Sequence, residues 1–396
     1  MAALTIVRVL FCGQGMTNLV EVYDDGVEKA QADWLALVDC GGDHALAKTA
    51  IDAIVAKVAA HDKRLDCLVI SHQDRDHLGL LTLLGPRLQK LGATIGKVFL
   101  GGICWKKGNR AIVDGFLTRL EYGGSEVRVD GPEASDYRAA TTRAELKAVA
   151  QGHGTFVRRL ITNVAFGSGA VRKNASSAVV VVENGTSAVL LPGDATLATM
   201  DAIDALPPGA KALLPRPVLG TSVPHHGALA TAVENYEAHG EPARFGYRSV
   251  DAFVTYLSSK RAVASAGPYN RPFHPVEEVL VRFHDPLLLV EDHTYMAWSF
   301  NDGNRRKPDG WRTLSTDREL HCTVKSIGEV AGADPGLKTR TAKGGVVQKF
   351  VTGDVVFRMA PPGVVPPERV VEFVPRGTLD VAVSSPDDGV VYAPAP

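Results

Sequence analysis

The sequence predicts an α/β protein, with strands and helices mixed along the chain and a β-rich segment at its end. First, short apolar runs such as residues 65–70 and 178–182 are rich in β-branched residues and have the length of buried strands. Second, helical patterns such as residues 45–60 and 276–283 lie between such runs. Third, polar clusters directly follow several strands, where loops commonly carry chemistry.

The chain is long enough for one large core and a smaller module, because 45% of its 396 residues are hydrophobic. All the polar clusters fall within residues 1–302, which we interpret as one domain with an inserted segment at about residues 103–165. Residues 303–396 are punctuated by Gly and Pro every few positions. We interpret them as a β-rich appendage that could dock a protein partner, cover an active site or mediate dimerisation.

The N-terminal elements are predicted to be strands. Residues 1–8 lack the basic start and the long apolar run of a secretion signal, so they are interpreted as a first strand. A Gly-Gln-Gly turn follows at residues 13–15. The next apolar run, residues 35–38, leads into Asp39 and then a pair of glycines, which is typical of a turn at the end of a strand.

The sequence Ser-His-Gln-Asp-Arg-Asp-His directly follows the strand predicted at residues 65–70. A tight turn can aim His72 and Asp74 at one metal ion while Asp76 and His77 face a second, since imidazole nitrogen and carboxylate oxygen suit zinc, manganese or iron. A lone His-x-Asp pair on a loop is usually solvated polar surface. Four residues of ligand type directly after a strand favour a metal site instead.

Further polar motifs follow in order along the chain. Apolar runs at residues 178–182 and 187–191 are joined through Asn-Gly and predict a hairpin, and the second run ends in Pro-Gly-Asp at Asp194. A Pro-His-His-Gly turn then carries His225 and His226. Adjacent histidines are often a surface or core pair, but flanking Pro and Gly fix the backbone and favour a site.

These motifs, in this order, resemble those of the metallo-β-lactamase superfamily. Asp74 stands where most members carry a second histidine, and this variant resembles the branch typified by the hydrolase domain of ComEC, a DNA-uptake protein. The Gly-Gln-Gly turn is similar to the opening of that branch, with Met16 replacing its usual aspartate. Residues 267–275 are similar to its Gly-x-x-Asn-x-x-x-His-Pro element.

The resemblance implies a four-layer αββα sandwich, two mixed sheets faced by helices, that holds two divalent metal ions, zinc or manganese. Asp39 would brace the metal loop through hydrogen bonds, and Asn270 would support the site. Many members carry another histidine before the bridging aspartate; His153 is the candidate here, and we interpret it as a loop residue rather than a ligand. The implied ligands are His72, Asp74, Asp76, His77, Asp194 as the bridge, His225 and His274.

The predicted reaction is hydrolysis. Two divalent ions lower the pKa of a shared water and neutralise charge on the substrate. An additional histidine resembles that of phosphodiester-cleaving members, so we assign His226 as general acid beside Asp76 as the other catalytic residue. We expect a phosphodiesterase or nuclease acting on a nucleic acid or nucleotide. A lactone, thioester or β-lactam hydrolase on the same fold, and a non-catalytic metal-binding partner subunit, are the alternatives.

Composition narrows the class of protein. The net charge of −1 gives no general attraction to nucleic acid. We find no apolar stretch of about 18 residues that could span a membrane. The five cysteines are scattered without paired spacing, which suits a reducing compartment. We therefore expect a cytoplasmic protein without a membrane anchor.

Overall fold

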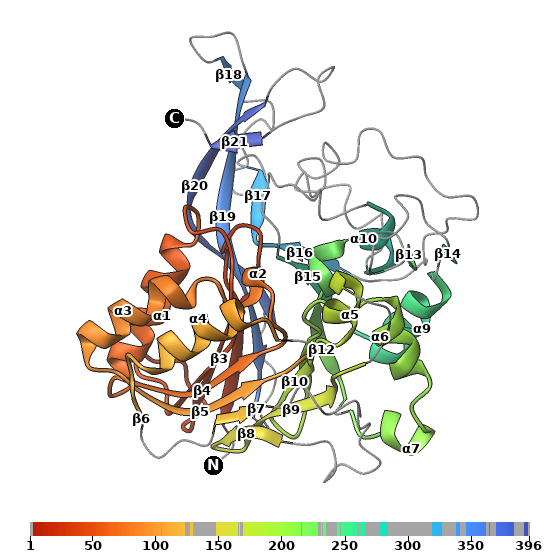
Figure 1. Cartoon of the computed structure of the whole chain (residues 1–396), viewed down its shortest axis with the longest axis horizontal. Helices are drawn as coiled ribbons and strands as arrows, with labels where there is room; N and C mark the ends of the chain where they lie inside the picture. Colours follow the sequence, from red (N-terminus) through yellow and green to blue (C-terminus); the bar gives the residue numbers. More distant parts are fainter. Residues whose placement is uncertain are drawn as a thin grey trace.

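The structure of the chain is a computed structural model (Figure 1). It describes residues 3–103, 105–122, 127–129, 148–164, 166, 169–214, 216–228, 231, 233–234, 244–245, 247–259, 261–265, 277–283, 319–326, 338–340, 346–361, 364, 370–383 and 392–394. All statements of structure below concern these residues.

The described residues form two large sheets. The first has 12 strands, with the order β21-β20-β19-β1-β2-β3-β4-β5-β6 and with β17 and β18 on β19 and β7 on β5. Its central strands are β1 (Leu4–Val9), β2 (Thr17–Tyr23), β3 (Trp34–Cys40), β4 (Arg64–Ile70) and β5 (Thr94–Leu100). The outer ones are β6 (Glu121–Tyr122), β7 (Val127–Val129), β17 (Val324–Ser326), β18 (Lys338–Arg340), β19 (Val346–Met359), β20 (Val371–Val383) and β21 (Tyr392–Pro394).

The second sheet has seven strands in the order β16-β15-β12-β11-β10-β9-β8. They are β16 (Glu319–Cys322), β15 (Arg261–Ala264), β12 (Val218–Ser222), β11 (Ala188–Leu191), β10 (Val179–Glu183), β9 (Thr155–Ile161) and β8 (Ala148–Gly152). A short pair, β13 (Val233–Glu234) with β14 (Arg244–Phe245), stands apart. The hairpin predicted around Asn-Gly is confirmed as β10 and β11, which pair antiparallel.

Helices cover the outer face of each sheet (Figure 1). On the first sheet lie α1 (Lys48–Ala60), α3 (Leu81–Leu91) and α4 (Lys107–Leu117). On the second lie α6 (Leu197–Asp204), α9 (Tyr247–Leu257) and α10 (Glu277–Phe283). Short helical turns complete the loops: α2 (Arg75–Leu78), α5 (Gly169–Ala175), α7 (Pro208–Lys211) and η1 (Pro224–Gly227).

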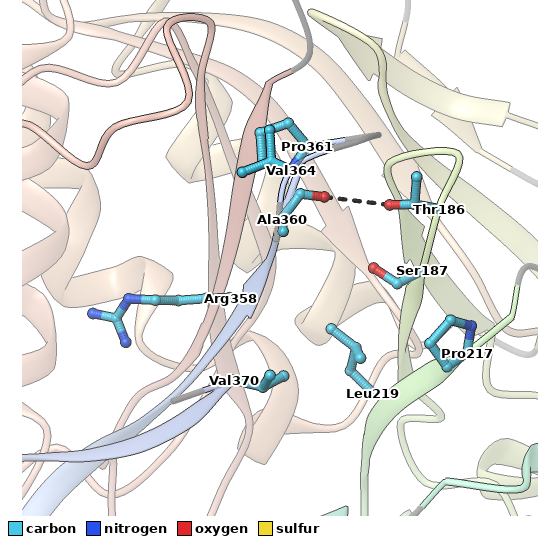
Figure 2. Close-up of a pocket in the computed structure, with 9 residues that line it drawn as sticks. All are labelled: Thr186, Ser187, Pro217, Leu219, Arg358, Ala360, Pro361, Val364 and Val370. Atoms are coloured by element: carbon cyan, nitrogen blue, oxygen red, sulfur yellow. Dashed lines mark hydrogen bonds between the residues drawn. The ribbon is translucent and has the colours of Figure 1, made fainter. Parts of the chain in front are cut away.

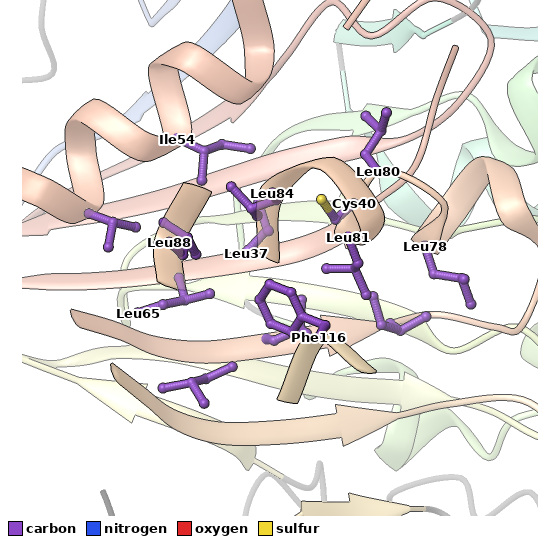
Figure 3. Packing of buried hydrophobic residues seen from close by; sticks show 14 of the residues in the cluster. Leu37, Cys40, Ile54, Leu65, Leu78, Leu80, Leu81, Leu84, Leu88 and Phe116 are labelled. Atoms are coloured by element: carbon purple, nitrogen blue, oxygen red, sulfur yellow. The ribbon is translucent and has the colours of Figure 1, made fainter. Parts of the chain in front are cut away.

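Alternation along the strands builds the layers. In β10, Val179 and Val181 pack toward the helices of the second sheet, whereas Val180 and Val182 pack into the core between the sheets. Successive side chains of a strand point to opposite faces, so an unbroken valine run marks a strand buried on both sides. Figure 3 shows the outer core of the first sheet, where Phe116 and the leucines of α3 meet strand residues. The predicted four-layer αββα sandwich is confirmed.

The C-terminal segment contributes strands to both sheets. β16 pairs in parallel with β15, and β19 pairs antiparallel with β1. The predicted boundary between residues 302 and 303 lies outside the described residues. Where β19 ends against the β10–β11 turn, a pocket of about 250 Å³ is lined mainly by apolar residues and by Arg358, and Thr186 donates a hydrogen bond to the Ala360 carbonyl there (Figure 2).

None of the described helices is long and apolar enough to cross a membrane. Four cysteines, at positions 12, 40, 67 and 322, are buried free thiols within the part of the chain that the structure describes. Burial raises the pKa of both Cys12 and Cys67 to about 12, so each acts as a small apolar side chain.

Candidate metal centre

The loops after four strands meet at one place. Asp39 lies at the end of β3, the His72–His77 loop follows β4, Asp194 follows β11, and the paired histidines follow β12. Backbone hydrogen bonds join the loops: the amide of Ala178 donates to Ser71, and that of His225 donates to Gly193. Each loop is therefore held in place by the next one rather than by its own strand alone.

Asp39 holds the first loop. Its Oδ1 accepts a hydrogen bond from the Ser71 amide at 2.6 Å, and its Oδ2 accepts one from the Ser71 hydroxyl at 2.8 Å. The same Oδ2 lies 2.8 Å from Nδ1 of His77. All three residues are buried. Asp39 thus fixes the plane of the His77 ring and leaves Nε2 directed into the site.

Close backbone approach requires glycine beside this loop. A Cβ on Gly41 would lie 2.0–2.2 Å from backbone atoms of Asp76 and His77. The amide of Met16 donates to the Asp76 carbonyl at 2.9 Å, so the turn that contains the Gly-Gln-Gly sequence also supports the loop. Met16, which replaces the usual aspartate, therefore supports the loop through its backbone amide, while its side chain is fully buried.

The carboxylate of Asp194 faces two pairs of imidazoles. Its Oδ1 lies 2.8 Å from Nε2 of His77 and 3.5 Å from Nε2 of His226. Its Oδ2 lies 3.4 Å from Nε2 of His72 and 3.5 Å from Nε2 of His225. One buried carboxylate thus has a pair of histidines on each of its oxygens.

Ligand atoms of Asp76, His77, Asp194 and His226 lie within 4.8 Å of one another. Nδ1 of His226 lies 2.9 Å from the Ser265 carbonyl, which can only accept, so Nδ1 carries the proton and Nε2 is directed at Asp76 and Asp194. Two carboxylates and two imidazoles match the donor set of a divalent transition metal. On the other side, Nε2 of His72 is buried without a hydrogen-bond partner among the described residues, which fits a second ligand position.

The paired histidines sit in strained backbone. His225 has φ 49° and His226 has φ 51°, followed by Gly227 at φ 77°. Left-handed backbone costs a non-glycine residue about 1–3 kcal/mol and persists where surrounding structure enforces it. Here the turn lets adjacent side chains reach opposite oxygens of one carboxylate.

The carboxylates and imidazoles of the site stabilise each other's charged forms. Burial alone would raise the pKa of Asp194, but His77, His225 and His72 hold it well below its ordinary value. Burial would lower the pKa of His77, but Asp194 and Asp39 raise it well above the usual range. The pKa of Asp76 is likewise lowered, because the nearby His226 and the charge of His77 outweigh burial. Protonated His77 therefore balances the negative charge of Asp194 and Asp39, as a bound cation would.

Not all predicted ligands join this group. Both carboxylate oxygens of Asp74 lie against Nζ of Lys173, at 2.5 and 2.6 Å. His274 and Asn270 fall outside the described residues. His153 lies in the turn between β8 and β9, with Nδ1 2.5 Å from Asp24, and does not belong to the cluster of ligand atoms.

Sequence reasoning assigned no role to several residues that support the site. Ser71 bonds Asp39, Nδ2 of Asn174 lies 3.2 Å from Nε2 of His225, and the Ser265 carbonyl orients His226. Lys173 likewise carries no prediction from the sequence. The available signal is position: Ser71 and Ser265 directly follow apolar runs, and Lys173 and Asn174 lie a few residues before the run at 178–182.

No family model and no curated protein matches the chain. Similar solved structures include the metallo-β-lactamase fold protein YhfI from Bacillus subtilis, with 11% identity and a TM-score of 0.39 over 67% of this chain and 86% of that one. The short form of human tRNase Z gives 13% identity and 0.38 over 66% and 92%. A diphosphatase of the PhnP family gives 12% and 0.36 over 66% and 85%. Similarity this low carries no inference about chemistry, so the residues of the site must supply it.

Proposed function

We propose that this protein is a metal-dependent hydrolase with two cation positions, one on each oxygen of Asp194. The observation that supports this proposal is the buried carboxylate of Asp194, which has one pair of histidines on each oxygen. The pairs are His77 with His226 and His72 with His225. Asp76 adds a second carboxylate to the first position. A site that only stabilised the fold would not need open ligand directions beside a shared carboxylate.

Divalent ions bound there would supply an activated water and neutralise charge on the substrate. The protein's own residues supply orientation. Asp39 fixes His77, the Ser265 carbonyl fixes His226, and Asn174 lies against His225. Fixed ligands hold the site ready without reorganisation during the reaction.

We propose a phosphodiester as the substrate class, because two divalent ions held beside Asp194 would neutralise the negative charge on a phosphate. His226 has two proposed roles. As general acid it would protonate the leaving oxygen from Nε2; as a ligand it would use the same atom to hold a cation. Its place among Asp76, His77 and Asp194 favours the ligand role.

Hydrolysis of bis-p-nitrophenyl phosphate with added Mn²⁺ or Zn²⁺ tests the proposal, beside a p-nitrophenyl ester and a β-lactam. Wild type is compared with Asp76→Asn, Asp194→Asn and the control His153→Ala, whose histidine lies outside the site. Metal-dependent phosphodiester cleavage that both aspartate variants lose and His153→Ala keeps supports the proposal. Turnover of the ester or lactam alone would favour the alternative hydrolases, and no turnover of any substrate would favour a binding subunit.

His226→Ala separates the two roles of that residue. A ligand role predicts loss of bound metal together with activity. A general-acid role predicts normal metal content, with activity lost on alkyl phosphodiesters and kept on substrates with a p-nitrophenyl leaving group. Unchanged activity on the poor leaving group would rule out the acid role.

A further inference from the structure

Lys173 binds a carboxylate that the site could otherwise use. Its Nζ lies 2.5 and 2.6 Å from the two oxygens of Asp74, and the two side chains are only 16% and 24% exposed. Asp74 is the N-cap residue of α2, yet its side chain makes no capping hydrogen bond. An aspartate in that position normally bonds the first turn of the helix. The Asp74 carboxylate instead contacts Lys173 with both of its oxygens.

The lysine is held beside the histidine pair on Oδ2. The next residue, Asn174, contacts His225, and the Lys173 carbonyl accepts a hydrogen bond from the Ser176 hydroxyl at 2.7 Å. The Ser176 carbonyl in turn accepts the Asn163 amide at 2.9 Å. The ammonium therefore comes from an anchored segment of backbone rather than from a free surface side chain.

The two sides of Asp194 are accordingly unequal. On Oδ1, Asp76, His77 and His226 already converge. On Oδ2, His72 and His225 are present, but Asp74, two residues after His72, is neutralised by the ammonium of Lys173. An ammonium and a divalent ion compete for one carboxylate, and a half-buried pair with two short contacts is stronger than an exposed one.

We propose that Lys173 is an internal competitor for the second cation, so that the protein binds one ion tightly at Asp76, His77, Asp194 and His226 and a second weakly until Asp74 is released. This inference rests on the proposed metal centre. It makes Lys173 a positioning residue that sets metal stoichiometry, and the lysine released by the second ion would be free to meet an anionic substrate.

Equilibrium dialysis of the full chain against graded Mn²⁺, followed by metal analysis, tests the inference without reference to activity. Lys173→Met and Lys173→Gln are expected to strengthen the weaker binding step by about fivefold to tenfold, the effect of removing one competing half-buried charge. Lys173→Arg should leave it weak. The control is Lys211→Met, which removes a more exposed lysine–carboxylate pair, with Asp204, away from the site.

The carboxylate must be the reason for the change. In an Asp74→Asn background, Lys173→Met is expected to have no effect on the weaker step. Unchanged binding in both Lys173 variants, or an equal effect with and without Asp74, would overturn the inference while leaving the tight step intact. Failure of the metal centre itself is distinct, because wild type would then show no step that Asp194→Asn removes.

Discussion

At the scale of single residues, the site depends on groups that orient its histidines. Asp39 accepts three hydrogen bonds, two from Ser71 and one from His77, while it is buried itself. The carboxylate of Asp39 satisfies all three of these donors, so replacing it leaves at least one buried donor without an acceptor. The residue that contacts no ion can therefore matter as much as one that does.

Asp39→Asn is expected to weaken Mn²⁺ or Zn²⁺ binding by about 10–100-fold, because the amide has one acceptor oxygen for the three donors of Ser71 and His77. Isothermal titration calorimetry measures the affinity. Asp66→Asn is the control, since Asp66 accepts from the Leu35 amide and contacts His61 outside the site. Equal affinities in the two variants would contradict the orienting role.

The contact of His61 with Asp66 predicts a pH dependence of stability. Nε2 of His61 lies 2.7 Å from Asp66, and this hydrogen bond raises the pKa of His61 despite burial. Burial would raise the pKa of Asp66, but the His61 bond lowers it. The histidine contribution is complete below about pH 6.5 and is lost as pH rises through the raised pKa; the aspartate contribution is lost as pH falls through its lowered pKa.

His61→Ala should therefore cost about 1–2 kcal/mol of unfolding free energy near pH 5–6 and less at pH 8–9. Urea unfolding at each pH, with the difference taken from wild type, measures this cost. When His61→Ala is introduced into the Asp66→Asn protein, its cost in unfolding free energy should no longer depend on pH. A cost that grows with pH would show that the pair does not act as described.

At the scale of elements, hydrophobic periodicity and turn residues predict the strands and hairpins that form from neighbouring residues. The valine run of β10, the Asn-Gly hairpin and the strand before the metal loop follow from periodicity and turn chemistry. The contact between Lys173 and Asp74 joins residues 99 positions apart and is a lysine–aspartate ion pair, a type common on protein surfaces. No local sequence pattern therefore predicts it. The register of β19 on β1 joins residues such as Thr5 and Met359 and is equally invisible in either segment alone.

Gly41 shows how one element makes room for another. Gly41→Ala is expected to cost more than about 2 kcal/mol and to reduce metal binding, because the new Cβ would overlap the Asp76–His77 backbone. Gly108→Ala in α4 is the control, since nothing lies within 4 Å of its added Cβ. That change should stabilise by about 0.5–1 kcal/mol. Thermal unfolding and metal titration of both variants check the pair.

At the scale of the whole molecule, the C-terminal strands connect the two sheets. Phe357 of β19 is fully buried in the core between the sheets, and its ring lies where a side chain on Gly220 of β12 would stand. β19 also extends the first sheet by pairing with β1 (Figure 1). A residue late in the chain therefore helps to hold together the two halves whose loops form the candidate metal centre.

Phe357→Ala is expected to cost about 3–5 kcal/mol of unfolding free energy, the usual loss for an emptied aromatic site in a core. Because the ring packs between the sheets, the variant should also weaken Mn²⁺ binding although it contains every ligand. Val364→Ala, at a side chain that is 56% exposed, should change stability by less than about 0.5 kcal/mol. Denaturant unfolding with metal titration tests both effects. Normal metal affinity in a destabilised Phe357→Ala protein would mean that each half keeps its loops in position independently of the other.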